Sequence, residues 1–164
     1  MGVSGGEIYT SLERGIIDAT EWIGPYHDYK MGFHKIAKYY YYPGWHEPGT
    51  VLEMIANKEA FDQLPNELQE MVRVVALKYN QLVFSEFEAK NNAYLVKLIN
   101  EEDVKLRMFP DSVLSKLKEY SEQVIEELIS EDAQGRKIYS SFLKFKKEMT
   151  EWNKTTERAI LPYL

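Results

Sequence analysis

The sequence predicts a helix-rich α/β chain. Apolar residues recur at helical spacing over long stretches, most clearly from 66 to 99 and from 110 to 130. Short runs rich in β-branched and aromatic residues, which favour strands, separate the helical stretches. The strands do not alternate evenly with helices as in a complete doubly wound sheet. We therefore expect them to be pieces of a larger sheet.

The first 57 residues carry most of the strand signals. A short helix is expected over 7–15, and the run IIDATEWI predicts a strand over 16–23 that ends at a Gly-Pro turn. A loop with a short helix follows over 26–37. Four consecutive tyrosines predict a strand over 39–42, and VLEMIA predicts another over 51–56.

Helical signals dominate from residue 58 onward. A short helix is expected over 58–64, since Pro65 ends it, and one long helix is expected over 66–99. The alternating run VKLRMF predicts a strand over 104–109. Pro110 then opens a helix that reaches about Ser130.

The last helix carries a heptad seam. Its apolar residues step by four, three, four and three positions, which is the spacing of a coiled coil. Such a seam packs either on its own domain or on another subunit, and the pattern alone leaves both open. The seam consists of Ile138, Phe142, Phe145, Met149 and Trp152.

Composition and motifs exclude several classes of protein. The chain has 164 residues, a net charge of −6 and no cysteine, which argues against a nucleic-acid partner and excludes a thiol nucleophile. No apolar run is long enough to span a bilayer, and the first residues do not read as a signal peptide. Nucleophile-elbow, P-loop and dinucleotide motifs are absent. His27, His34 and His46 lack metal-pair spacing, and we expect them to be ordinary surface or core histidines.

Two acidic positions stand out as candidate ligands. Glu21 and Trp22 precede the Gly-Pro turn, and Glu47 lies beside Trp45 in the aromatic run YYYYPGWHEPG. Burying a carboxylate among aromatic rings is costly without a cation or donors. Two carboxylates that meet would favour a metal ion between them, whose coordination a carboxylate ligand could complete. The alternative is a pair of exposed acids beside core aromatics.

At these residues the sequence resembles a known family. GGEIYTSLERGIIDATEW and GPYHDYKMGFHKIAKYYYYPGWHEPG are similar to the extracytoplasmic solute receptors of TRAP transporters, the DctP-type family. The nearest branch binds 2-oxo acids such as pyruvate and includes receptors described for mannitol and chloroaromatic compounds. The later stretches LPNELQEMV and FPDSVLSKL fit the family too.

The resemblance implies the C-terminal portion of a two-lobed, periplasmic-binding-protein-like fold with a long C-terminal helix. Residues 1–57 would form the hinge and ligand-cleft strands, 58–131 a helical lobe, and 132–164 a C-terminal helix exchanged between the subunits of a homodimer. The family's N-terminal half supplies the signal peptide, an arginine that pairs with the ligand carboxylate and a glutamine near the metal. The full-length receptor would be periplasmic.

The resemblance also assigns roles to residues. Glu21 would coordinate a cation, sodium or calcium, and Trp22 would offer its carbonyl to the cation and its ring to the ligand. Glu47 matches the family's second acidic position, which we expect to contact both cation and ligand. Tyr42 and Trp45 are expected to be pocket walls.

The implied function is solute binding without catalysis. The receptor would bind a small carboxylate and present it to the membrane subunits of a TRAP transporter, with no nucleic acid involved. The rival reading is a helical dimerisation or interaction module that binds no ligand.

Overall fold

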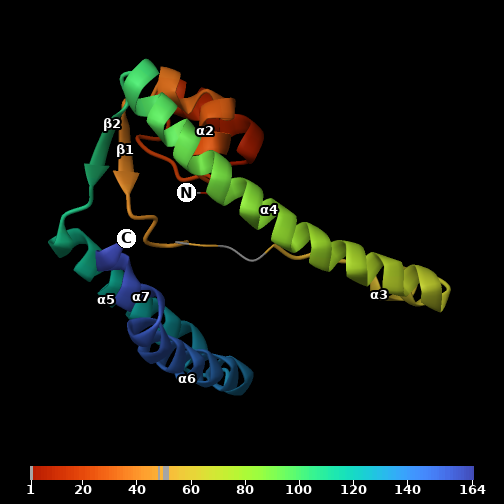
Figure 1. Cartoon of the computed structure of the whole chain (residues 1–164). Coiled ribbons are helices and arrows are strands. Elements are labelled where there is room, and N and C mark those ends of the chain that lie inside the picture. The colour runs from red at the N-terminus through yellow and green to blue at the C-terminus, as the bar shows by residue number, and fades with distance from the viewer. Residues whose placement is uncertain (1, 48, 50–51) are drawn as a thin grey trace. The chain divides into compact units, whose positions relative to one another are not determined.

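The computed structural model describes residues 2–47, 49 and 52–164 of the chain. It is helix-rich and contains a small parallel sheet, so the predicted α/β class is confirmed (Figure 1). The chain divides into two compact units, one ending at Phe109 and the other spanning Pro110–Leu164. Each unit is described by itself.

The first unit begins with short helices and contains both strands. Asn57 caps α3, because its side-chain oxygen accepts a hydrogen bond from the Ala60 amide at 2.9 Å. Gly32, at φ 78°, ends α2 in the left-handed conformation that glycine adopts readily. The elements are η1 (Gly5–Glu7), α1 (Ile8–Glu13), α2 (Pro25–Met31), η2 (Phe33–Lys35), β1 (Tyr39–Tyr42), α3 (Lys58–Asp62), α4 (Asn66–Glu101) and β2 (Lys105–Met108).

The two strands form a parallel pair. Tyr39 lies opposite Lys105 and Tyr42 lies opposite Met108. Parallel strands require a long crossover connection, which α3 and α4 supply here (Figure 1). The pairing continues one residue past β2, since the Phe109 amide donates to the Tyr42 carbonyl at 2.9 Å.

The core of the first unit lies where α2 packs against the C-terminal part of α4 (Figure 1). Leu98 is the most deeply buried of its side chains, at 2% exposure. Rings also meet across this interface, with the centroids of Tyr26 and Tyr94 separated by 4.9 Å. The buried apolar residues among those described are Ile8, Tyr26, Phe33, Leu98 and Val104.

Two predicted strands are wrong. Residues 16–23 form bends and irregular backbone, and residues 52–56 are irregular too, while Val51 lies outside the described residues. A strand needs a partner to complete its ladder of hydrogen bonds, and the described sheet contains β1 and β2 alone. Instead, the Leu52 carbonyl accepts a hydrogen bond from the Asn80 side chain of α4 at 2.7 Å.

The second unit is entirely helical. Its elements are α5 (Asp111–Ile129), α6 (Ala133–Thr155), α7 (Glu157–Ile160) and η3 (Leu161–Tyr163). Asp132 caps α6 by accepting a hydrogen bond from the Gln134 amide at 2.9 Å. None of these helices contains a buried residue. Among the described residues of the whole chain, no helix combines the length and apolarity needed to cross a membrane.

Candidate functional site

A contact between Glu21 and His46 joins two segments that carry predicted site residues. The His46 Nε2 lies 2.9 Å from the Glu21 Oε2. Glu21 belongs to the irregular segment that ends at the Gly-Pro turn, and His46 belongs to the loop after β1. The Glu21 side chain is 61% exposed, so its oxygens are accessible to a ligand.

The loop after β1 presents its predicted residues to solvent. Trp45 and Tyr42 are 41% and 44% exposed, and Glu47 is exposed. The Trp45 ring lies edge-on against the His46 ring, with centroids 5.1 Å apart. Among the four tyrosines of β1, only Tyr40 is half-buried. The loop aromatics therefore line a surface of this unit, while Tyr40 faces its interior.

Trp22 is half-buried against the start of the chain. A Cβ added at Gly5 would lie 2.8 Å from the Cη2 atom of the Trp22 ring, which is closer than such atoms approach in proteins. A Cβ added at Gly6 would meet nothing within 4 Å. Gly5 therefore allows the indole to pack on the N-terminal backbone.

Asp28 connects the Gly-Pro turn with β1. Its Oδ1 accepts hydrogen bonds from the amides of Ile23 at 3.3 Å and Gly24 at 3.2 Å, and its Oδ2 accepts one from the Tyr40 hydroxyl at 2.6 Å. Burial raises the pKa of the Asp28 carboxyl, and these three donors oppose the rise. Burial, together with the charge of Asp28, raises the pKa of the Tyr40 hydroxyl, which therefore stays a donor.

The turn is also fixed to the long helix. The Tyr26 amide donates to the Asn91 Oδ1 of α4 at 3.2 Å, which satisfies one free amide at the start of α2. A Cβ at Gly24 would lie 3.1 Å from the same Asn91 oxygen, so glycine permits this close approach. The segment just after Glu21 and Trp22 is thus tied to both α4 and β1.

The exposed carboxylates of this region are of the chemical type that binds a hard cation. Carboxylate and carbonyl oxygens are the ligands that calcium prefers, and Glu21 and Glu47 provide accessible carboxylates. Within residues 2–47, 49 and 52–164, however, no three His, Asp or Glu side chains gather closely enough to hold a metal ion by themselves. The present partner of Glu21 is His46 rather than Glu47.

Sequence reasoning missed three residues that organise this region. His46 was expected to be an ordinary surface or core histidine, yet it bridges to Glu21. Asp28 and Asn91 act through hydrogen bonds to residues up to 65 positions away. Only Asp28 could have been found from the sequence. An Asp in the first turn of a helix that begins with Gly-Pro is well placed to accept hydrogen bonds from the free amides at the start of that helix.

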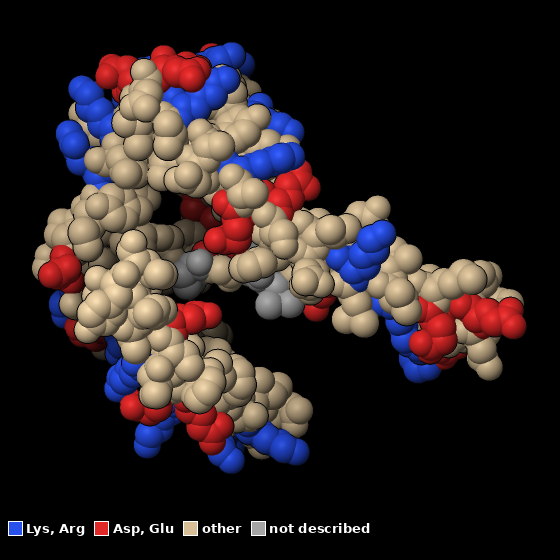
Figure 2. All heavy atoms as spheres, viewed as in Figure 1, with Lys and Arg blue, Asp and Glu red and all other residues tan. Residues whose placement is uncertain are grey.

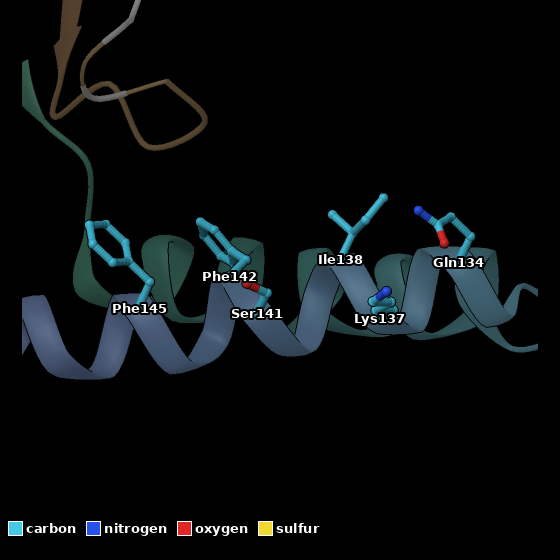
Figure 3. A pocket seen from close by; sticks show the side chains of 6 residues that line it. All are labelled: Gln134, Lys137, Ile138, Ser141, Phe142 and Phe145. Carbon is cyan, nitrogen blue, oxygen red and sulfur yellow. The ribbon is translucent and has the colours of Figure 1, made fainter.

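Two open grooves lie elsewhere. One follows α6, where Ile138, Phe142 and Phe145 project from one side of the helix (Figure 3). The other lies between residues 52–54 and the middle of α4, next to Val75 and Tyr79. Neither groove is lined by a predicted site residue.

The sequence and the fold of this chain match those of extracellular solute-binding proteins. Residues 2–132 match the family model DctP, bacterial extracellular solute-binding protein, family 7, and the chain belongs to this family. A curated relative, the monocarboxylate 2-oxoacid-binding periplasmic protein of Nostoc sp. strain PCC 7120, is 37% identical over 153 residues. That alignment covers 93% of this chain and 42% of the relative, so the chain spans less than half of the relative's length.

Solved structures agree with this assignment. A TRAP transporter solute-binding protein from Bordetella bronchiseptica RB50 superimposes with a TM-score of 0.90 at 33% identity, over 99% of this chain and 48% of that one. It is a mixed-occupancy dimer with copurified calcium and picolinate in one active site and an apo second site. A TRAP periplasmic solute-binding protein from Pseudoalteromonas atlantica T6c, with bound sodium and pyruvate, gives a TM-score of 0.89 at 33% identity over 100% of this chain and 50% of that one. All of these relatives are solute-binding proteins.

Proposed function

We propose that this chain forms the C-terminal portion of a periplasmic TRAP-transporter receptor that binds a 2-oxo acid such as pyruvate through a bridging cation. The Glu21–His46 contact is the observation that carries this proposal. It places the segment of Glu21 and Trp22 beside the loop of Trp45 and Glu47, and the proposed cation and ligand would lie between them. The relatives that bind a 2-oxo acid, or sodium with pyruvate, support the class of ligand.

The proposed cation would allow an anionic ligand to bind beside two acidic side chains. Glu21 and Glu47 would each provide a carboxylate oxygen, and Trp22 its main-chain carbonyl. The cation would offset the repulsion between these acids and the carboxylate of the solute. Trp22, Trp45 and Tyr42 would close the apolar side of the ligand.

Coordination by this chain alone is incomplete, because the proposal gives it two carboxylates and a carbonyl where calcium takes six to eight oxygens. The solute and the remaining half of the receptor would supply further ligands. Closure of two lobes around the solute would then be favoured by binding, and the closed form would be presented to the membrane subunits.

We also propose that the receptor is a homodimer joined through α6. Four residues of the seam are more than half exposed within the chain, which supports burial of the seam by a second subunit. They are Ile138 at 60%, Phe142 at 53%, Phe145 at 61% and Trp152 at 60%. The dimeric relative from Bordetella bronchiseptica supports the same assignment. The rival interaction module would use this seam but bind no solute.

Substitution of the two acids tests the ligand site. In the complete receptor, Glu21→Gln and Glu47→Gln should each weaken pyruvate binding by at least about tenfold, since each removes a charge that the cation requires. Isothermal titration calorimetry in a sodium-free buffer, after calcium has been removed by chelation and with either sodium or calcium added back, measures the effect and distinguishes the two cations.

Glu126→Gln serves as the matched control, because it makes the same change on an exposed face of α5. It should leave pyruvate affinity unchanged. Wild-type affinity in both Glu21→Gln and Glu47→Gln would contradict the cation-bridged site.

A further inference from the structure

We propose that the part-buried hydrogen bond between Asp28 and Tyr40 is a positioning device that sets the separation of the two ligand-bearing segments. The inference rests on the proposed function and assigns roles to two residues that would touch neither cation nor solute. Asp28 is 9% exposed, and its Oδ2 accepts the Tyr40 hydroxyl at 2.6 Å.

Asp28 first holds the segment that carries Glu21 and Trp22. Its Oδ1 accepts the amides of Ile23 and Gly24, the two residues that directly follow Trp22. Hydrogen bonds from two successive amides to one oxygen fix the direction in which the chain enters the turn. The Trp22 carbonyl belongs to the peptide group of the Ile23 amide, so Asp28 orients the proposed carbonyl ligand through that shared plane.

Tyr40 then connects this turn to the loop of Glu47. Tyr40 lies in β1, which is fixed in register against β2 with Tyr40 opposite Leu106. The strand runs directly into the loop that carries Trp45 and Glu47. The Tyr40 hydroxyl is therefore a link between the turn and a strand whose position the sheet already determines.

The alternative link between the segments is weaker. The Glu21–His46 contact lies at the surface, with the Glu21 side chain 61% exposed, and exposed ion pairs contribute little to stability. A cation that took the Glu21 carboxylate would also compete with His46 for it. The part-buried Asp28–Tyr40 bond is independent of the cation and keeps the two segments in place when the surface contact opens.

Tyr40→Phe tests this role, because it deletes the hydroxyl and leaves the ring in its half-buried place. In the complete receptor, we expect the dissociation constant for pyruvate at saturating cation to rise at least about tenfold, and the cation concentration at half-saturation to rise with it. Tyr39→Phe is the matched control, since it makes the same change one position away on a side chain that is 58% exposed. It should stay within about twofold of wild type.

Two further measurements separate positioning from simple stabilisation. Binding is measured at 15 °C on variants whose melting temperatures lie well above this value, so a purely structural bond would lower the melting temperature and leave affinity unchanged. Asp28→Asn should weaken binding as well, and Asp28→Asn combined with Tyr40→Phe should be no worse than Asp28→Asn alone, because both changes break one link.

The outcomes distinguish this inference from the proposed function. Pyruvate affinity in Tyr40→Phe equal to that of Tyr39→Phe, with wild type binding normally, would overturn the positioning role alone. Fully additive losses in the double variant would overturn it too. A wild-type receptor that binds no 2-oxo acid in the presence of either cation would overturn the proposed function and this inference together.

Discussion

At the scale of single residues, His34 is a buried histidine whose environment favours the neutral ring. It is 7% exposed, stacks on Tyr29 with centroids 4.6 Å apart, and its Nδ1 has no hydrogen-bond partner among the described residues. Burial lowers the pKa of His34 from its ordinary value of 6.5, although the Glu102 carboxylate, 3.8 Å from Nε2, opposes the shift. The unfolded chain therefore binds a proton at this histidine more readily than the folded chain does.

This difference predicts a loss of stability in acid. The contribution of neutral His34 to the free energy of unfolding is fully present above pH 6.5 and is lost as the pH falls through the lowered folded value. His34→Gln cannot titrate, so its stability should decline less between pH 7.5 and pH 5. Urea unfolding followed by circular dichroism at several pH values measures both slopes, and parallel slopes would contradict this account.

At the scale of elements, the α6 seam predicts dimerisation. Burying an indole contributes about 2–3 kcal/mol, and a carboxylate in its place adds a desolvation cost, so Trp152→Asp should weaken the dimer at least about 100-fold. Size-exclusion chromatography with light scattering should show a dimer for wild type and a monomer for this variant. Thr150→Asp, a charge placed on α6 outside the seam, should remain dimeric. A monomeric wild type would mean that the seam packs within its own receptor.

The helices and strands also show which parts of the fold could be predicted from the sequence alone. Helical periodicity and prolines located α3, α4 and α5 to within a few residues, because these signals are local. β1 and β2 were predicted for the same reason. Residues 16–23 and 52–56 are rich in residues that favour strands, but within the described chain they have no neighbouring strand to pair with. The amino-acid composition of a segment does not reveal whether such a neighbour exists.

For the candidate site, too, the sequence predicted some features and could not predict others. Glu21, Trp22 and Glu47 were selected by residue type and by resemblance, both of which are written in the sequence. The contact between Glu21 and His46 spans 25 positions, and the Tyr26–Asn91 bond spans 65. Hydrogen bonds between residues this far apart depend on how α2, α4 and β1 pack, which no local pattern contains.

At the scale of the whole molecule, much apolar surface is left uncovered. The first half of α4 exposes Leu68, Met71 and Leu77 at 45%, 61% and 74%, and the helices of the second unit bury no residue. Acidic and basic side chains are scattered over the visible face, with broad uncharged areas between them (Figure 2). Soluble proteins rarely leave apolar areas of this kind free, so we expect the remaining half of the receptor and a second subunit to cover them.

The central claim is that this chain supplies one side of a cleft that closes around a cation-bound 2-oxo acid. Calorimetric titration of pyruvate tests it most directly, with this chain alone and the complete receptor compared at the same concentration of sodium or calcium. We predict tight, cation-dependent binding by the complete receptor and no measurable heat with the chain alone, because half a cleft cannot enclose the ligand. Micromolar binding of pyruvate by the chain alone would contradict the account.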